Sequence, residues 1–432
     1  MKPQFAMHAV IWLLVGVTAC TIHPPRRELL NGQLIIEGVP KIPIEILDEL
    51  RPYQNSRSAQ FLGWLDEGIL ISTRFANTAQ LHRVAQPLGM RQQVTFEGEP
   101  VSSASLSPDP SAGGFVYSRD TSGSEFYQLY WFDLATAESR LLTDGESRYT
   151  DVAWAPSGRR FAYTTTERNG TDWDLHIQDL SGRKAVALED RGVGWIALDW
   201  TPDEKRLLAT QFKSMAQGTL HEVDLETRLV TNLLDTDLDV AIDLACYDGT
   251  GDAVFFASDM GAEFKRLHRL DLITGDIDLV TGDIPWDVEE FDVSPDGDKL
   301  AMVINEDGYS RLYVVRTKDL GFIALPEIPT GVIYQVAFAP DSSRVGFVLN
   351  RPTAPADVFS IDFEARKLTR WTQSELGGLV ARNIVEPELF RYRSFDGRDI
   401  PAFIYRPNAR PPYPVLVRIH GGPEGQARPR FS

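Results

Sequence analysis

Residues 151–164 read DVAWAPSGRRFAYT, and this stretch of strand, turn and strand decides the fold. Pro156 stands where its fixed φ suits the second position of a tight turn, and Gly158 closes the turn. Apolar residues run into the turn and out of it, which is the chemistry of a β-hairpin and not of a helix. The turn recurs along the chain at Pro108, Pro156, Pro202, Pro295 and Pro340.

The spacing of these prolines predicts seven units. The gap between Pro202 and Pro295 is twice the others, and its midpoint falls on Tyr247-Asp248-Gly249, a degenerate copy without proline. A second degenerate copy, WLDEG at residues 64–68, lies one period before Pro108. The repeat therefore counts five proline turns and two turns without proline.

A second marker counts the same number. A strand pair follows each of the seven turns, and one position in this pair serves as the marker. In two of the seven units this position is taken by Arg316 and by the stretch around Val84. The other five units carry Asp133, Asp179, Asp224, Asp271 and Asp362. A period of about 46 residues with four strands per unit is typical of a propeller blade. The predicted fold class is mainly β, a seven-bladed β-propeller over residues 56–380, because two markers in phase disfavour a β-sandwich.

Aromatic residues recur on the strands of these units. We interpret them as packing between blades rather than as binding residues. They include Trp154, Trp200, Phe291 and Phe338.

The bulk composition excludes several function classes. The formal net charge of −18 argues against nucleic acid as a partner, because phosphates need patches of Lys and Arg. Of the two cysteines, Cys246 lies in an apolar stretch without an obvious partner and is predicted to be a buried, inert thiol. No Cys/His cluster has zinc spacing, so neither a metal nor another cofactor is expected.

The first twenty residues have the pattern of an export signal. Lys2 precedes an apolar core at residues 9–17 that is too short to span a bilayer. Val17-Thr18-Ala19-Cys20 resembles a bacterial lipoprotein box. This predicts a signal peptide over 1–19, lipid attachment at Cys20, an N-terminal extension over 20–55, and a location in the periplasm or cell envelope. The alternative is an ordinary secretory signal cleaved after Ala19.

The pattern changes after the last blade. The sequence SFDG at residues 394–397 is a turn between two strands, and PVLVRI at 414–419 is a continuous apolar run. A strand without alternation is typical of one buried on both faces of an α/β sheet. The run ends in His420-Gly421-Gly422, which resembles the oxyanion loop of α/β-hydrolases.

This order of elements resembles the prolyl oligopeptidase family of serine peptidases, in particular its acylaminoacyl-peptidase and dipeptidyl-peptidase branch. The combination of DGRDIPAFIYRP (396–407) with VRIHGGPEGQ (417–426) carries the resemblance. It implies that residues 385–432 are the first strands of a truncated α/β-hydrolase domain. It also implies short peptides as substrates and a propeller that restricts access, without implying an oligomeric state.

In this family the catalytic Ser, Asp and His follow the HGG loop, with the serine in a GxSxG turn. No GxSxG occurs here; the segment 308–312 (GYSRL) comes nearest and is interpreted as a hairpin turn inside a blade. No catalytic residue is therefore assigned, and the chain is expected to be an inactive fragment. The alternative is a lipid-anchored binding propeller without catalysis, which has no reason to keep an HGGPEGQ loop.

The resemblance assigns half of an oxyanion hole. Gly421 and Gly422 are predicted to present backbone N–H groups to the carbonyl oxygen of a substrate, and glycine permits that close approach. His420 is expected to shape the loop rather than act as a base. Glu289-Glu290 brings to mind the paired glutamates that bind the substrate amino group in some dipeptidyl peptidases, but a solvated strand start is the preferred interpretation.

Overall fold

The computed structural model describes residues 26–29, 32–101, 103–189, 194–234, 239–282, 284–422 and 424–432. The chain divides into two compact units, 1–51 and 52–432. In the first unit β1 (Arg26–Leu29) and β2 (Leu34–Glu37) form an antiparallel hairpin, and α1 (Ile44–Gln54) begins there. The predicted signal peptide and Cys20 lie outside the described residues. Within the described ranges, no helix is long and apolar enough to cross a membrane.

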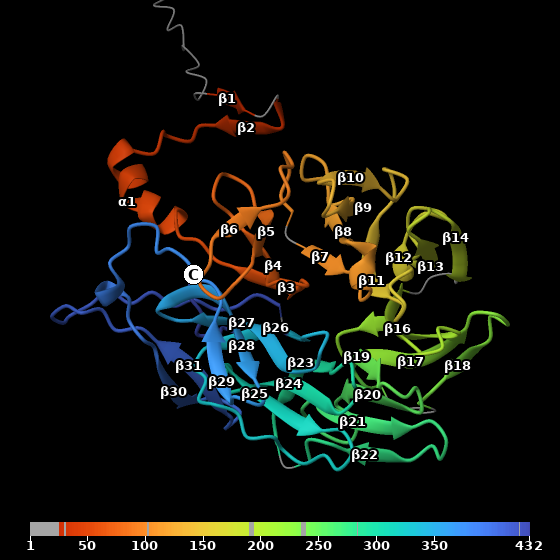
Figure 1. The fold of residues 1–432 in the computed structure, drawn as a ribbon. Helices are drawn as coiled ribbons and strands as arrows, with labels where there is room; N and C mark the ends of the chain where they lie inside the picture. The colour runs from red at the N-terminus through yellow and green to blue at the C-terminus, as the bar shows by residue number, and fades with distance from the viewer. Residues whose placement is uncertain are drawn as a thin grey trace, which may run out of the picture. The chain divides into compact units, whose positions relative to one another are not determined.

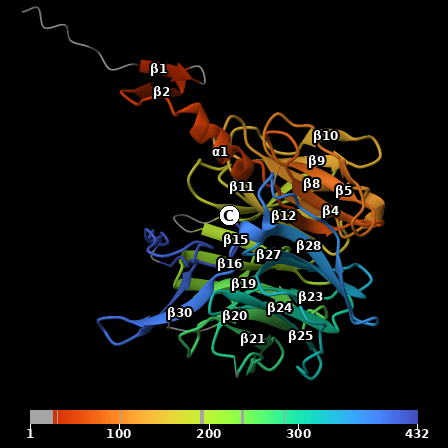
Figure 2. The same ribbon diagram turned by 90° about the vertical axis from the view of Figure 1, so that its left-hand side faces the viewer.

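The second unit confirms the predicted seven-bladed propeller. Figures 1 and 2 show its sheets following one another in chain order. The first three blades are β3 (Gln60–Trp64), β4 (Ile69–Thr73), β5 (Gln80–Val84), β6 (Arg91–Gln93); β7 (Ser103–Leu106), β8 (Gly114–Arg119), β9 (Gln128–Asp133), β10 (Glu138–Leu141); and β11 (Tyr149–Trp154), β12 (Arg160–Thr165), β13 (Asp174–Asp179), β14 (Lys184–Leu188). The next two are β15 (Gly194–Trp200), β16 (Arg206–Ser214), β17 (Gln217–Asp224), β18 (Val230–Asn232); and β19 (Ile242–Tyr247), β20 (Ala253–Ser258), β21 (Arg266–Asp271), β22 (Ile277–Leu279). The last two are β23 (Asp287–Val293), β24 (Lys299–Glu306), β25 (Tyr309–Arg316); and β26 (Val332–Phe338), β27 (Arg344–Arg351), β28 (Ala354–Asp362), β29 (Lys367–Arg370).

Blade 6 departs from the expected four strands. Its sheet contains β23, β24 and β25, and a single bridge between Val315 and Phe322 stands where a fourth strand would run. The following segment contains Pro326 and Pro329. Proline lacks the N–H that a strand ladder needs, so the pairing ends after one bridge. Short 3₁₀ turns outside the ladders lie at Pro110–Ala112 and Ala381–Asn383.

The repeated turns are tight hairpins, as predicted. The N–H of Gly158 donates to the carbonyl of Ala155 at 2.8 Å, and Gly158 has φ 65°. Neighbouring turns are also joined to one another, because Glu204 accepts the N–H of Ser157 at 2.7 Å from the turn of the next blade. The turns therefore link consecutive blades as well as consecutive strands.

The core lies between blades, and the aromatic residues predicted for it are found there. Trp200 is 2% exposed, and its indole N–H donates to the carbonyl of Ala153 in the preceding blade at 3.0 Å. Trp154 makes the same kind of bond to Ser105 at 3.2 Å. Apolar residues are thus buried where these blades meet, and the indole N–H bonds across the contact.

The ring closes where blade 7 meets blade 1. In the part of the chain that the structure describes, blade 1 contains only β3–β6 and blade 7 only β26–β29, so no strand from one end of the propeller joins the sheet of the other. The N–H of Ala59 donates to the carbonyl of Ala356 at 2.9 Å, and the indole of Trp64 donates to Ala337 at 3.0 Å. The described strands of the two blades share no sheet, so hydrogen bonds and packing hold the seam.

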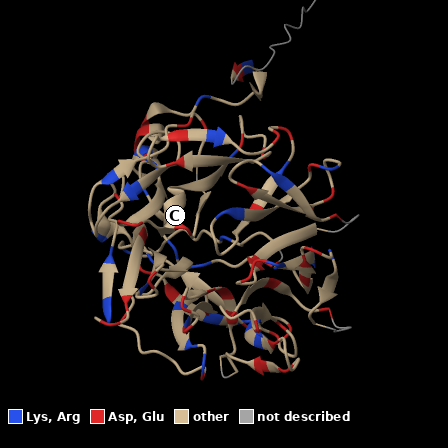
Figure 3. Ribbon diagram, turned by 45° about the vertical axis from the view of Figure 1, so that its right-hand side comes forward, with Lys and Arg blue, Asp and Glu red and all other residues tan. Residues whose placement is uncertain are grey.

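Charge is dispersed over the described ribbon. Segments with Lys or Arg alternate with segments carrying Asp or Glu on the strands and loops in Figure 3. The net charge of −18 is therefore not gathered in one stretch of the chain.

Candidate functional site

The segment that follows the propeller docks on blade 6. β30 (Glu388–Arg393) and β31 (Asp399–Ile404) form the predicted hairpin around the turn at 394–397. Arg391 pairs with the carboxylate of Asp307, and the ring of Phe403 meets Tyr309 edge to face at 5.4 Å. Asp307 lies in the turn between β24 and β25, so this turn is the hairpin's docking point.

Arg428 is the strongest link between the C-terminal segment and the propeller. Its guanidinium donates to both carboxylate oxygens of Glu289 at 2.6 Å, to the carbonyl of Gly308 at 2.9 Å and to the hydroxyl of Ser310 at 3.0 Å. The side chain of Arg428 is only 15% exposed. A charge-assisted contact in such surroundings is stronger than one on an open surface. The last residues of the chain are thereby fixed to the start of β23.

This contact corrects the interpretation of Glu289-Glu290 as a solvated strand start. Glu289 binds Arg428, and Glu290 accepts the backbone N–H groups of Gln335 at 2.8 Å and Val336 at 2.5 Å in blade 7. Burial raises the pKa of Glu290. Both glutamates are therefore structural groups, one holding the C-terminal segment and one joining two blades.

The Gly421–Gly422 loop makes a tight turn that needs glycine. Gly422 has φ 131°, and a Cβ there would lie 2.6 Å from the N of Gly425. His420 Nδ1 lies 2.9 Å from the carbonyl oxygen of Gly421, a contact within the loop itself. Both glycines are exposed, and within the described residues no hydrogen bond uses their N–H groups. Their assignment to an oxyanion hole stays a prediction.

The predicted strand over 414–419 is wrong for this structure, which has no β-strand there. Val415, Leu416, Val417 and Ile419 are 75–94% exposed. A strand buried on both faces needs a neighbour on each edge and cover on each face. None of the described residues supplies them, so the apolar run lies open.

Ser310, in the segment that comes nearest to a nucleophile motif, is a structural residue. Gly308 lies in the turn that follows β24, and the Ser310 hydroxyl serves Arg428. The prediction of a hairpin turn is confirmed. Cys246 is a free thiol whose pKa is raised by burial, in agreement with an inert role. In the described part of the chain no group of three His, Cys, Asp or Glu side chains is arranged for a metal ion.

Buried carboxylates on the first strands of the blades were not anticipated. Asp199 accepts the N–H of Tyr247 in blade 5, and Asp292 accepts the N–H of Phe338 in blade 7, each at 2.8 Å. Burial raises the pKa of Asp199 to about 6 and that of Asp292 to about 7. The signal for them was their shared position three residues before the repeated turn.

A repeated histidine was also missed. It follows a leucine on the third strand of four blades, and in each case burial lowers its pKa and an aromatic ring packs against it. The four are His82, His176, His221 and His268. The recurring Leu-His pair was visible in the sequence. These rings are core residues of the blades.

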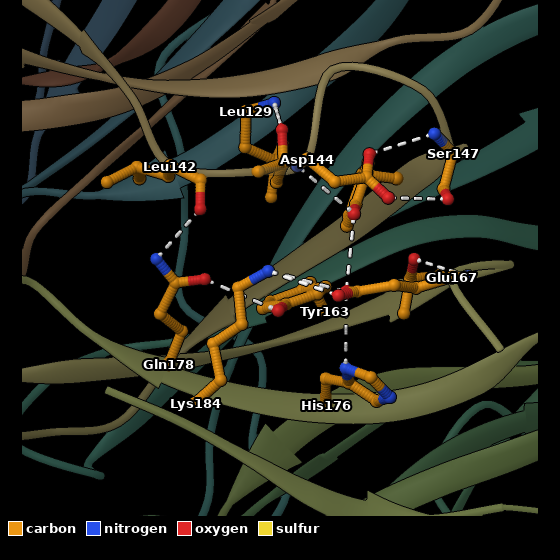
Figure 4. A network of polar contacts seen from close by, with 12 residues as sticks. Leu129, Leu142, Asp144, Ser147, Tyr163, Glu167, His176, Gln178 and Lys184 are labelled. Carbon is orange, nitrogen blue, oxygen red and sulfur yellow. Dashed lines mark hydrogen bonds and ion pairs between the residues drawn. The ribbon is translucent and has the colours of Figure 1, made fainter. Parts of the chain in front are cut away.

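One of them belongs to a polar network in blades 2 and 3. Figure 4 shows His176 beside Glu167, which also receives Lys184 Nζ at 3.4 Å. Tyr163 donates to Gln178, whose amide donates in turn to the carbonyl of Leu142 at 3.1 Å. The network ties the third strand of blade 3 to the loop that leaves blade 2.

Comparisons with known proteins agree with this architecture. The family model described as the N-terminal β-propeller domain of prolyl oligopeptidase matches residues 100–374. The uncharacterized peptidase YuxL of Bacillus subtilis (strain 168) is 30% identical over 112 residues, which are 26% of this chain and 17% of that protein.

Solved structures share the fold at low sequence identity. One, from a study of two prolyl endopeptidases and their inter-domain dynamics, has a TM-score of 0.70 at 14% identity over 85% of this chain. Prolyl oligopeptidase B from Galerina marginata, bound to a 35mer, has a TM-score of 0.68 at 14% identity over 83% of this chain. The chain spans 57% and 56% of the lengths of these two proteins.

Proposed function

Because this chain belongs to the prolyl oligopeptidase family of S9 peptidases, we propose that it is the propeller-bearing part of a serine peptidase that hydrolyses short peptides. The observation that carries this proposal is the docking of the C-terminal segment on blade 6. Arg428 and Glu289 fix the stretch after the HGG loop to the propeller, and Arg391 fixes the stretch before it. A propeller that only bound a ligand would not need to hold such a segment.

The proposed chemistry is acyl transfer through a covalent acyl-enzyme. A serine attacks the peptide carbonyl, and negative charge develops on the carbonyl oxygen. The N–H groups of Gly421 and Gly422 stabilise that charge, because fixed donors in a site shielded from water need no reorganisation during the reaction. In this family the serine and its Asp and His partners follow the HGG loop, and we place them C-terminal to that loop in this protein as well.

The test begins with the gene. The reading frame past codon 432 is determined, the longest product is expressed, and its serine is labelled with a fluorophosphonate probe beside an assay on chromogenic peptides. Gly422→Ala should lower kcat about 100-fold or more, because the Cβ would displace the oxyanion loop. Gly397→Ala is the matched control, since Gly397 also has a positive φ but open space around it.

Absence of a labelled serine in the longest product would favour the alternative, a binding propeller without catalysis. Equal kcat for Gly422→Ala and Gly397→Ala would remove the loop from the mechanism. The proposed restriction by the propeller is tested separately with a labelled short peptide and a labelled unfolded protein. The short peptide should be cleaved and the protein spared.

Export with a lipid anchor is proposed on the Val17–Cys20 pattern alone. Acylated Cys20 would hold the protein on the membrane surface of the cell envelope. Cys20→Ala should move the protein from the membrane fraction to the soluble fraction. Equal partitioning of the variant and the parent would contradict lipidation at this residue.

A further inference from the structure

A cleft of about 790 Å³ lies between blades 2 and 3. It is lined by the small residues Ser103 to Ser105 of β7, by Val116 to Ser118 of β8 and by the start of β11. Aromatic side chains form its walls: Tyr127, which is 43% exposed, the buried Tyr149, and the half-buried Trp173. The cleft thus combines an open mouth with apolar walls.

At the cleft, blades 2 and 3 lack a contact that two other pairs of neighbouring blades make. Five residues before the repeated turn, Glu290 of blade 6 accepts N–H groups from blade 7, and Gln335 of blade 7 accepts the N–H of Phe61 at 2.9 Å. Blade 2 has Ser103 at this position, and its hydroxyl bonds instead to Ser118 of its own blade at 2.6 Å. The other six pairs of neighbouring first strands pack closely, whereas β7 and β11 do not.

Asp151 occupies the same repeat position in blade 3 and faces the cleft. It stands in a bulge of β11 with φ 56°, a conformation that Asp adopts more readily than most residues. Its side chain is exposed to the cleft, yet the depth of the position raises its pKa through desolvation, partly offset by hydrogen bonds from Thr150 and Thr164. Among the described residues, no Lys, Arg or His forms an ion pair with Asp151.

The other charged residues of the cleft leave it acidic. Glu125 is exposed at the mouth. Arg148 also lines the cleft, with its guanidinium 4.5 Å from the centre of the Phe126 ring, so the charged lining residues Glu125, Asp151 and Arg148 sum to −1. Two carboxylates and aromatic faces are the surroundings that an organic cation prefers.

A hydrogen bond holds one aromatic residue of the cleft, and the cleft opens on the face of the propeller that holds the C-terminal segment. The hydroxyl of Tyr149 donates to Glu167 at 3.2 Å, and Glu167 belongs to the polar network shown in Figure 4. Asp151 lies near the start of β11 just as Glu289 lies near the start of β23, where Arg428 binds. In a propeller the starts of the first strands share one face, so the cleft opens on the face that holds the C-terminal segment.

We propose that this cleft binds the positively charged group of a peptide, with Asp151 accepting its hydrogen bonds and Tyr127, Tyr149 and Trp173 packing against the neighbouring side chain. The inference rests on the proposed function in that the ligand is a peptide. The cation is a Lys side chain or a terminal ammonium group, which present the same donors.

The test is calorimetric binding to the purified chain, which needs no hydrolysis. The probes are acetyl-Phe-Lys-Ala-amide, its neutral counterpart acetyl-Phe-norleucine-Ala-amide, and Phe-norleucine-Ala-amide with a free amino group. At least one cationic peptide should bind about tenfold more tightly than the neutral one, and Asp151→Asn should remove that difference. Comparison of the two cationic peptides shows whether the cleft binds a Lys side chain or a terminal ammonium group. Asn also tolerates a positive φ, so the backbone is preserved.

Two further variants sharpen the test. Asp243→Asn is the control, since Asp243 also lies on the first strand of its blade, one residue before the position that corresponds to Asp151, but pairs with Lys265 at 2.9 Å; it should bind like the parent. Ser103→Gln should supply the missing contact, closing the cleft and abolishing binding while raising resistance to urea.

Equal affinity of charged and neutral peptides, parent-like binding by Asp151→Asn, or full binding by a folded Ser103→Gln would each overturn the proposal. None of these results depends on a catalytic serine. Loss of the peptidase proposal therefore leaves this test standing, and a failed binding test leaves the peptidase proposal standing.

Discussion

Removal of Asp357 should strongly destabilise the propeller. It lies on β28 of blade 7, is 2% exposed, and faces Arg91 of blade 1, which is 8% exposed, at 3.8 Å. It also accepts hydrogen bonds from Arg370 at 2.5 Å, Thr372 at 2.8 Å and Ser374 at 2.9 Å. Asp357→Ala leaves the buried guanidinium of Arg91 without its ion-pair partner at the seam that closes the ring.

The magnitude follows from that geometry. Two unit charges 3.8 Å apart interact by about 4 kcal/mol at an effective dielectric constant of about 20. Removing one partner of a buried pair typically costs about 3–5 kcal/mol. At an m-value of about 3 kcal/mol per M, the urea midpoint of Asp357→Ala should fall by about 1.3 M. The midpoint is measured by tryptophan fluorescence.

Two controls accompany this measurement. Glu67→Ala breaks the ion pair between Glu67 and Arg83. Because the Glu67 side chain is 80% exposed, the free energy of unfolding should change by less than about 1 kcal/mol. The double variant Asp357→Ala/Arg91→Met should recover part of the loss, because it removes the unpaired cation as well. A fall of less than 1 kcal/mol in Asp357→Ala, or a double variant no more stable than the single one, would refute the reasoning.

Three further outcomes are expected. Trp200→Phe should lower the free energy of unfolding by about 1–3 kcal/mol, since the buried carbonyl of Ala153 loses its donor; a loss no larger than that of the exposed-pair control would contradict this role. Arg428→Met should speed proteolysis beyond residue 385, whereas Arg398→Met, at a side chain that is 74% exposed, should not; equal cleavage rates would deny the anchor. Stability should fall as pH drops below about 6.5, by up to about 1.4 kcal/mol per pH unit for each histidine whose pKa is lowered by burial, because the unfolded chain takes up protons that the folded chain refuses. The raised pKa values of Asp199 and Asp292 have the opposite effect on stability as the pH falls, so Asp292→Asn should make the loss of stability steeper. Replacement of a buried histidine by Gln should make the loss shallower. Urea titrations between pH 5 and 8 measure both effects, and the histidines concerned are His82, His176, His221 and His268.

Local chemistry made the blade count predictable. A proline at the second turn position and a glycine or small residue after it act within four residues, so they specify each hairpin wherever it lies. The alternating apolar residues then bury one face against the next blade. The same reasoning explains why the aromatic positions, such as Trp200, were correctly predicted as core.

Contacts across the ring were beyond reach of such patterns. Glu290 and Asp292 look like any acidic strand residues in the sequence, and only the position of the next blade shows that their carboxylates accept its N–H groups. Ser103 likewise looks like any strand residue in the sequence, and only the structure shows that β7 and β11 lie apart beside it. The exposed run at 414–419 shows that a local pattern alone is not enough, because an apolar segment without neighbouring strands forms no strand.

The sequence by itself therefore determined the seven hairpin-rich repeats, because turn geometry and alternation depend on residues close together in the chain. Only the tertiary structure decided how the ring closes at Asp357 and Arg91, where Arg428 holds the C-terminal segment, and that the cleft beside Asp151 exists. These features depend on residues tens to hundreds of positions apart, whose meeting is settled by the packing of whole blades.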